Sequence, residues 1–231
     1  MCGRFTLTSD MDILLYRFAA VMLVDLAYLP RYNIAPTQPV LAVVDEQGQR
    51  VFTVFKWGLI PFWAKDAKMA ARMINARSES LAEKPSFKHL LKRRRCLIPA
   101  TGFYEWISTV KPKQPVYIKL KSNEPFAFAG LWDEWQSPTG AVQSCTIITT
   151  DANSLIQPVH HRMPAILQPE QEQLWLDPAV NESRELLPLL KPYPSEEMEM
   201  YWVSPMVNSP RNDSPACIVP ASDPTGGTND F

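Results

Sequence analysis

The sequence contains no hydrophobic run long enough to cross a membrane. A membrane-spanning helix needs about 20 mostly apolar residues, and no uninterrupted apolar stretch approaches that length. The first residues also lack the basic segment and apolar core of a secretory signal. We therefore expect a cytoplasmic protein with no membrane partner.

The chain also lacks the cysteine spacing of a metal site. Its four cysteines, Cys2, Cys96, Cys145 and Cys217, are far apart and form no C-x-x-C pair, which argues against zinc. Without a secretory signal, a disulfide framework is not expected either. We expect no metal and no cofactor, and a reducing cytosol would leave Cys2 free.

Charge of one sign is also missing. The 23 Lys and Arg residues nearly balance the 24 Asp and Glu residues, for a net charge of −1. This is not the basic footprint of a typical nucleic-acid-binding domain, although a local basic groove remains compatible with it. The 231 residues are enough for one large domain or two small ones.

The chain has no internal repeat, and its 22 prolines are spread throughout, which favours many short elements joined by fixed turns. A first helix is expected over 9–20 with Ser9 as N-cap. Strands are expected at 40–44, 51–57, 96–99, 116–120, 126–131, 145–149, 165–167 and 200–203. Further helices are expected at 78–84, 86–93, 169–176 and 182–190. The pattern predicts an α+β fold with a curved, mostly antiparallel sheet or open barrel and flanking short helices. We expect one domain over 2–219 and a disordered tail over 220–231.

Cys2 is the residue with the most distinctive chemistry. If Met1 is removed, Cys2 carries a free α-amine beside its thiol, and this pair condenses with an aldehyde to a Schiff base and then a thiazolidine ring. An α-amine titrates at about 7.7–8.0, so it can react near neutral pH. Position alone favours an incidental residue in a loose terminus.

Three further polar residues stand out by their settings. Asn75 lies at an expected strand-to-helix junction, where a catalytic role and a simple helix cap are equally good interpretations. Glu105 is flanked by Tyr104 and Trp106, and burial there would raise its pKa and make it a usable general acid or base, whereas a solvent-facing strand position is the alternative. His160 is one of only three histidines and suits proton transfer near pH 7, with a surface histidine pair as the alternative.

The arginines near these residues could form a cationic rim. Arg4, Arg77 and Arg162 each lie within two residues of Cys2, Asn75 or His160. Arg162 is a plausible phosphate clamp. Trp57 is expected in the core, Trp63 is as compatible with base stacking as with packing, and the run 92–95 is expected to be a solvated helix end.

Nine blocks in consistent order resemble the SRAP family (SOS response-associated peptidase), whose members crosslink to abasic sites in DNA. They are MCGRFT at 1–6, RYNIAP at 31–36, WGLIPFWA at 57–64, MINARSE at 73–79, CLIPATGFYEW at 96–106, FAFAGLW at 126–132, TIIT at 146–149, HHRMP at 160–164 and VSPMVNSP at 203–210. One departure is His161, where the family commonly has aspartate.

The resemblance implies that Cys2 forms a covalent thiazolidine with the ring-opened sugar of an abasic site in single-stranded DNA, with lyase chemistry as a side reaction. It assigns catalytic roles to Asn75, Glu105 and His160. It places Thr149 at the same site, assigns phosphate contacts to Arg4, Arg77 and Arg162, and puts Trp63 at a strand-separating edge. It also implies a monomer that associates with the nucleoid during DNA damage.

Two other functions fit the same residues. One is a peptidase that acts on other proteins through an N-terminal cysteine nucleophile. The other is a module that binds single-stranded DNA without covalent chemistry. Met1 must leave before a thiazolidine can form, either by self-processing or by a general aminopeptidase, and the sequence leaves both routes open.

Overall fold

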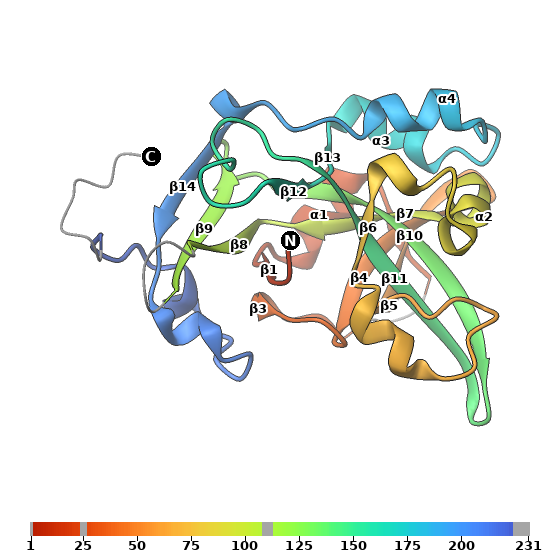
Figure 1. The fold of residues 1–231 in the computed structure, drawn as a ribbon, viewed down its shortest axis with the longest axis horizontal. Helices are drawn as coiled ribbons and strands as arrows, with labels where there is room; N and C mark the ends of the chain where they lie inside the picture. The colour runs from red at the N-terminus through yellow and green to blue at the C-terminus, as the bar shows by residue number, and fades with distance from the viewer. Residues whose placement is uncertain (1, 24–26, 108–112, 224–231) are drawn as a thin grey trace.

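A ring of five strands forms the centre of the molecule (Figure 1). In this computed structural model, which describes residues 2–23, 27–107 and 113–223, the ring follows the order β11, β10, β7, β4 and β5. These strands span β4 (Pro39–Glu46), β5 (Gln49–Trp57), β7 (Arg95–Ala100), β10 (Phe126–Ser137) and β11 (Gly140–Asp151). Neighbours in the ring are antiparallel, except that β5 returns to β11 in parallel and closes it as a mixed barrel.

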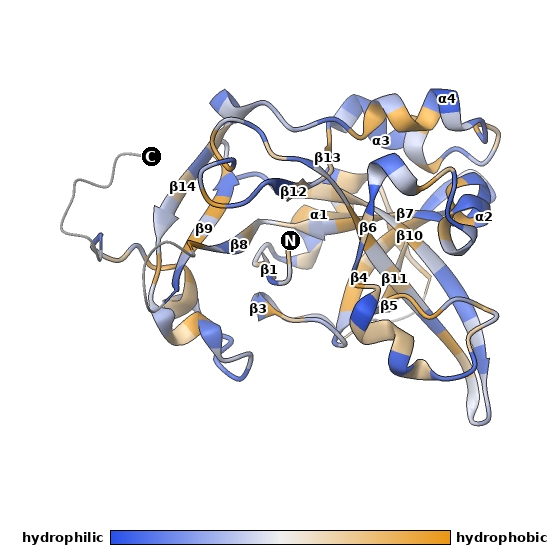
Figure 2. Ribbon diagram, in the orientation of Figure 1, coloured by the Kyte–Doolittle hydropathy of each residue, from blue (hydrophilic) through white to orange (hydrophobic). Residues whose placement is uncertain are grey.

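The barrel closes around a continuous hydrophobic core. All six residues of β7 are buried, and the hydrophobic residues that dominate β4 are visible in Figure 2. Phe5 packs edge-on against both Trp57 and Phe128, with ring centroids 5.2 and 5.7 Å apart. Trp57 is fully buried, which confirms that it is a core residue. The chain start is therefore anchored to the barrel by a buried aromatic cluster.

A second, antiparallel sheet carries the start of the chain. Its order is β14 (Met198–Trp202), β9 (Gln114–Leu120), β8 (Gly102–Ile107), β1 (Phe5–Leu7) and β3 (Arg31–Ile34). A Cβ atom at Gly102 would lie 2.2 Å from the Tyr117 hydroxyl, so only glycine allows β8 and β9 to pair here. Phe5 pairs with Phe103, and this register runs the chain start alongside β8.

Four short strands extend the barrel sheet, and two of them pair with β11. β6 (Asn75–Arg77) pairs with it in parallel, and β12 (Arg162–Pro164) pairs with it in antiparallel orientation. β13 (Ile166–Leu167) joins β10, and β2 (Val21–Met22) joins β5. β11 therefore contacts four other strands, two of which carry predicted site residues.

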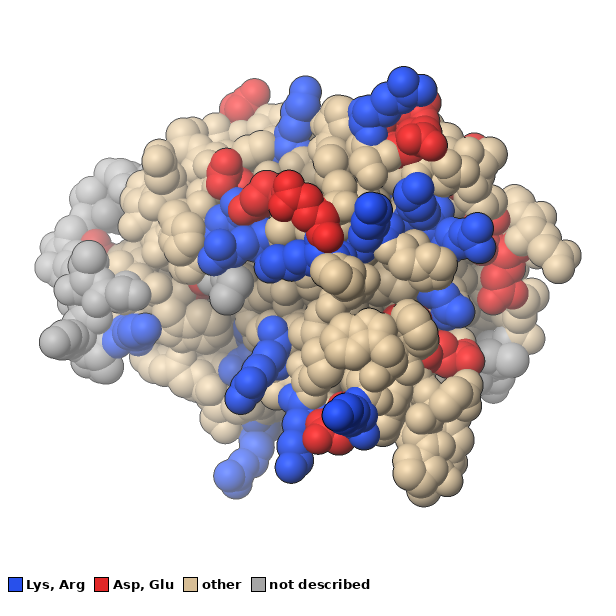
Figure 3. Space-filling model, turned by 45° about the vertical axis from the view of Figure 1, so that its right-hand side comes forward, with Lys and Arg blue, Asp and Glu red and all other residues tan. Residues whose placement is uncertain are grey.

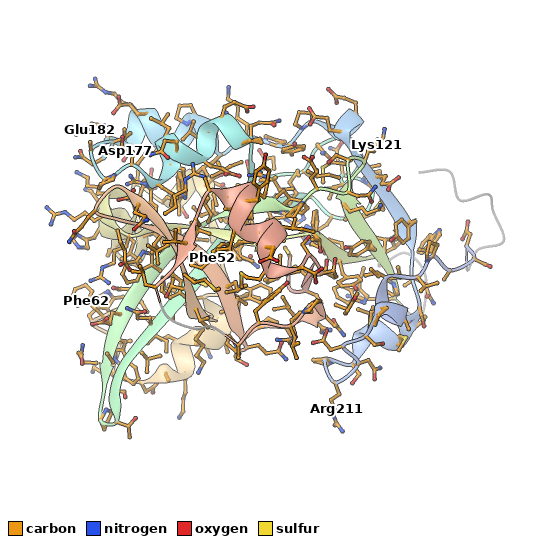
Figure 4. All side chains as sticks on the ribbon, turned by 180° about the vertical axis from the view of Figure 1, so that it is seen from behind. Phe52, Phe62, Lys121, Asp177, Glu182 and Arg211 are labelled. Carbon is orange, nitrogen blue, oxygen red and sulfur yellow. The ribbon has the colours of Figure 1, made fainter. Side chains whose placement is uncertain are left out.

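The helices are short and lie on the outside of the sheets. The α-helices are α1 (Met11–Phe18), α2 (Pro85–Arg93), α3 (Pro169–Leu176) and α4 (Ser183–Leu186). Short 3-10 helices span Ala67–Arg72, Ser78–Ser80, Leu187–Leu189, Ser195–Glu197, Pro205–Asn208 and Pro215–Ile218. Phe52 lies behind α1 in Figure 4 and meets Phe18 edge-on at 6.3 Å, so α1 covers this side of the barrel. None of the helices within the described ranges is long and apolar enough to span a membrane.

The expected α+β class with a mostly antiparallel curved sheet is confirmed, but several boundaries were wrong. The first helix begins at Met11 rather than Ser9, because Asp10 takes the extended N-cap conformation. The helix expected over 78–84 is a single turn, and the one expected over 182–190 is divided into α4 and a 3-10 turn that contains Pro188. The strands expected at 126–131 and 145–149 extend into one long hairpin. In the expected tail, Pro220 bridges to Val203, and 224–231 lie outside the described residues.

Candidate active site

Cys2 lies inside the protein rather than in a loose terminus. Its side chain is fully buried, and its carbonyl oxygen accepts a hydrogen bond from Asn75 Nδ2 at 2.9 Å. Its Sγ lies 3.9 Å from the carbonyl oxygen of Arg4. Burial raises the pKa of the Cys2 thiol far above its usual range, and the negative charge of Glu105 raises it further. Cys2 is therefore held in place as a neutral thiol.

Glu105 lies on β8, next to the first residues of the chain. The backbone N–H of Tyr104 donates to the carbonyl oxygen of Arg4 at 3.0 Å, which sets Glu105 beside Cys2. The Glu105 side chain is only 4% exposed, so the alternative of a solvent-facing strand position is wrong. Burial raises the pKa of its carboxyl group, which brings that group closer to the range in which it can give and take protons near neutral pH.

Asn75 begins β6 and faces the chain start. It pairs with Ile147 on β11, and the following 3-10 turn starts three residues later at Ser78, so Asn75 does not cap it. Its Nδ2 holds the Cys2 carbonyl, whereas its Oδ1 is buried and has no hydrogen-bond partner among the described residues. A buried amide oxygen without a partner costs free energy, and it can be satisfied by a ligand that donates a hydrogen bond.

Thr149 is the point on β11 where two site strands meet. It pairs with Arg77 of β6 on one side and with Pro164 of β12 on the other. Its side chain is fully buried, with Oγ1 3.5 Å from the carbonyl oxygen of Ala76. Thr149 thus joins the strand of Asn75 to the segment that follows His160.

His160 lies at the end of the loop that leads into β12. His160 Nδ1 lies 2.9 Å from the backbone nitrogen of Arg162 and 3.2 Å from its carbonyl oxygen. The shorter contact, in which the Arg162 N–H donates to Nδ1, assigns the proton of the neutral ring to Nε2. Burial lowers the pKa of His160, which favours this neutral form. The ring also stacks on His161, with centroids 4.4 Å apart. His160 therefore presents an Nε2–H donor.

The three arginines that are predicted to contact phosphate differ in how exposed they are. Arg162 is 5% exposed and pairs with Asp151 at 2.7 Å and Glu79 at 2.8 Å, so its guanidinium is engaged inside the protein. Arg4 is half-buried, and its Nη1 donates to Asn33 Oδ1 at 2.8 Å. Arg77, by contrast, is exposed. Figure 3 shows Lys and Arg side chains in a band across one face, with acidic side chains directly beside it.

Trp63 lies outside the barrel in the loop after β5. It is 49% exposed, and its neighbour Phe62 is 64% exposed, whereas most aromatic residues of the chain are buried. Figure 4 shows Phe62 at the periphery of the molecule. Trp63 also borders a pocket of about 270 Å³ lined by Lys65, Asp66 and Met69. Two neighbouring exposed aromatic rings form a surface on which bases can stack.

The sequence did not lead us to expect that two polar residues, Asn33 and Arg95, are buried. Asn33 is fully buried and bonds to Arg4 and to a C-terminal loop, and the signal for it was its place in the RYNIAP block. Arg95 was expected at a solvated helix end, but it is 5% exposed and donates to three backbone carbonyls at 2.6–2.8 Å, those of Leu91, Asp177 and Val180. Arg95 therefore fastens α2 and α3 to the barrel instead of facing solvent.

The cysteines and acidic groups form no metal centre in the part of the chain that the structure describes. All four cysteines are free and buried, and no group of three or more His, Cys, Asp or Glu residues there is arranged to bind a metal ion. The predicted site residues supply a thiol, a carboxyl, an amide and an imidazole. These features define the class of the protein: a mixed-barrel α+β protein that buries its second residue, a cysteine, beside a carboxyl group.

Comparison with known proteins assigns the family. Residues 1–210 match the family described as SOS response associated peptidase (SRAP), and the chain belongs to it. It is 48% identical over 221 residues to the abasic site processing protein YoqW of Bacillus subtilis (strain 168), across 94% of this chain and 99% of that protein. It is 36% identical over 226 residues to the abasic site processing protein HMCES of Gallus gallus, across 84% of this chain and 67% of that protein.

A solved structure gives the same result for the fold. A crystal structure of a protein from Bacteroides thetaiotaomicron superposes with a TM-score of 0.82 at 30% sequence identity. The match covers 96% of this chain and all of the other. The closed barrel and the second sheet are thus features that this chain shares with an experimentally determined structure.

Proposed function

We propose that this protein processes abasic sites in single-stranded DNA by forming a covalent thiazolidine crosslink through Cys2. The observation that carries the proposal is the arrangement around Cys2, whose carbonyl is bonded to Asn75 and whose thiol lies within the electrostatic influence of Glu105. The names of two similar proteins, both abasic site processing proteins, support the same substrate. We propose that it acts as a monomer in the cytoplasm, at the nucleoid when DNA is damaged.

The reaction begins once Met1 has been removed. The Cys2 α-amine attacks the C1′ aldehyde of the ring-opened sugar, and the carbinolamine loses one water molecule to give a Schiff base. The thiol then adds to C1′, the C–S bond forms, and the thiol proton passes to the nitrogen. The sequence consumes no oxidant or reductant and releases one water molecule.

The side chains divide the proton transfers between them. Glu105, whose pKa is raised by burial, accepts a proton from the amine and returns it to the leaving hydroxyl, and it then carries the thiol proton to the nitrogen. His160, with Nε2–H as a donor, gives a hydrogen bond to the sugar oxygen during ring opening and stabilises the charge that develops there. Asn75 Oδ1 accepts a hydrogen bond from the amine or a sugar hydroxyl, which satisfies its buried oxygen.

Ring closure by the thiol competes with strand cleavage. A Schiff base at C1′ acidifies the α-proton of the sugar, so β-elimination is a built-in side reaction. Addition of the Cys2 thiol removes the Schiff base and protects the strand. The crosslink therefore shields the lesion, and a variant without the thiol should cleave more DNA.

The test uses protein whose intact mass shows that Met1 is absent. Incubation with single-stranded DNA carrying an abasic site should give a heat-stable adduct with the wild type and with Cys96→Ala, which changes a buried cysteine of the barrel strand β7. Cys2→Ala should give none, and Cys2→Ser should give only an imine that borohydride traps, with more strand cleavage. If the wild type forms no adduct, the proposal fails.

The same experiment separates the two alternatives. A non-covalent binding module would retain DNA affinity in Cys2→Ala and form no adduct in either protein. A general peptidase would cleave peptides other than its own Met1 and would not need the abasic site. Placing one alanine between Met1 and Cys2 keeps the thiol but removes its α-amine, so it should abolish the adduct and confirm that both groups react.

A further inference from the structure

Asn33 links the beginning of the chain to its C-terminal part. It lies on β3 and is fully buried. Its Oδ1 accepts a hydrogen bond from Arg4 Nη1 at 2.8 Å, and Arg4 Nη1 also donates to the carbonyl oxygen of Val207 at 2.7 Å. The Asn33 amide nitrogen approaches three carbonyl oxygens of one loop, those of Val207 at 3.1 Å, Ser209 at 3.0 Å and Asn212 at 2.6 Å.

Arg4 connects this hydrogen-bond network to Cys2. Its backbone carbonyl accepts from the Tyr104 N–H at 3.0 Å and lies 3.9 Å from Cys2 Sγ. Its guanidinium lies over the Trp106 ring at 5.7 Å. Side chain and backbone of Arg4 are therefore both fixed, only two residues from the reactive thiol.

Asp213 fastens the same loop without touching Arg4. Its carboxylate accepts from the backbone N–H groups of Tyr32 and Asn33 and pairs with Arg31. The loop thus has two attachments to β3. Of these two, only the Asn33 side chain also bonds Arg4, whose Nη1 has the Val207 carbonyl of the loop as its other partner. This difference provides a matched control for a test of Asn33.

We propose that Asn33 is a positioning residue that holds Cys2 at the reacting distance by fixing Arg4. Arg4 then serves the alignment of the chain start as well as any contact with phosphate. A misplacement of about 1 Å at a reacting atom can cost about 100-fold in rate, so a single side chain remote from substrate can control the reaction. The inference rests on the proposed crosslinking function for its kinetic effect, but not for its effect on the structure.

The kinetic test compares Asn33→Ala with Asp213→Ala, both without Met1. Asn33→Ala should crosslink at least about tenfold more slowly than the wild type at saturating abasic DNA. Its affinity for DNA with a tetrahydrofuran abasic analogue, which has no aldehyde, should stay unchanged. Asp213→Ala loosens the same loop but leaves the Asn33 side chain bonded to Arg4, so it should retain most of the rate.

A second readout does not depend on the reaction. The Tyr104 amide, which donates to Arg4, should exchange its hydrogen faster in Asn33→Ala relative to the Ala129 amide, which donates to Ala165 inside the barrel sheet. Asp213→Ala should keep the wild-type ratio. The ratio corrects for any general loss of stability.

The outcomes separate the two proposals. If the wild type forms no adduct but the exchange ratio changes only in Asn33→Ala, the proposed function fails and the positioning role stands. The positioning role is overturned if Asn33→Ala keeps the wild-type rate and ratio. It is also overturned if Asp213→Ala slows crosslinking as much as Asn33→Ala does, because loop attachment alone would then explain the effect.

Discussion

The inner part of the site, around Cys2, differs from its outer rim, around Trp63, in how many side chains are already buried and hydrogen-bonded within the protein. Around Cys2 the groups are buried and hydrogen-bonded, with Cys2 fully buried and Glu105 4% exposed. At the rim, Trp63 is 49% and Phe62 64% exposed, and Arg77 is exposed as well. Burial shifts pKa values and fixes geometry, whereas exposed rings and cations are available to a large ligand. If the proposed function is correct, the difference predicts that mutations can separate the chemical step from DNA binding.

The largest expected effect is on the chemical step of the inner part. Glu105→Gln should lower the crosslinking rate about 10²- to 10⁴-fold, because a positioned general acid or base contributes about that much. Affinity for the tetrahydrofuran analogue should not change. Single-turnover kinetics measure the rate, and Glu83→Gln, at an exposed position, is the control. An unchanged rate in Glu105→Gln would remove this carboxyl group from the mechanism.

The next effect concerns binding at the rim. Trp63→Ala should weaken binding of single-stranded DNA by about 1–3 kcal/mol if one base stacks on the ring. The crosslinking rate at saturating DNA should stay near that of the wild type. Fluorescence anisotropy measures the affinity, and Tyr16→Ala, which removes a 91% exposed ring from α1, should bind normally. Equal losses in both variants would mean that Trp63 has no special contact.

The two arginines that flank Thr149 should respond differently. Arg162→Met leaves the buried Thr149 carbonyl without its donor and should cost about 1–3 kcal/mol of unfolding free energy. Arg77→Met should leave stability unchanged but reduce the slope of log affinity against log salt by about 0.7, as loss of one single-strand phosphate contact would. Urea unfolding and salt titrations measure these effects. A stable Arg162→Met would contradict the assignment of Arg162 to the interior.

The smallest effect is the pH dependence of stability that Glu105 contributes. Its pKa is raised in the folded protein, so between the unfolded and the folded pKa values the native state binds more protons. Stability should therefore fall as the pH rises from about 4.3, the ordinary pKa of glutamate, towards the raised pKa of Glu105 in the folded protein. Glu105→Gln should remove this loss and melt at a higher temperature than the wild type at neutral pH. Thermal unfolding at several pH values measures the difference, and a lower melting temperature would contradict it.

The sequence singled out Cys2, Asn75 and Glu105 by their local chemistry and by the order of the motifs. The structure brings these three residues together, and their catalytic roles stay predictions. The sequence could not show that Arg162 is buried, because its partners Asp151 and Glu79 come from other elements. Asn33 escaped for the same reason, since its partners are up to 179 positions away.

The sequence predicted the fold class, but it did not predict how the barrel closes. Short strand-like runs indicated most barrel strands, and Pro169 correctly marked the start of α3. The two-residue and three-residue strands carry too few residues for a pattern, and β6 exists because β11 pairs with it. The parallel pairing of β5 with β11, which closes the barrel, joins segments about 90 positions apart and leaves no local signal.

The position of β11 also has a consequence for the order of events during folding. β5, β6, β10 and β12 all pair with β11, so the strands that carry Asn75 and Arg162 have no partner until the hairpin of β10 and β11 exists. Pairing of distant segments is slow because chain entropy must be lost first. We expect the hairpin to form early and the reactive centre to assemble late. A newly made chain would then carry an unassembled Cys2 site until its barrel has closed.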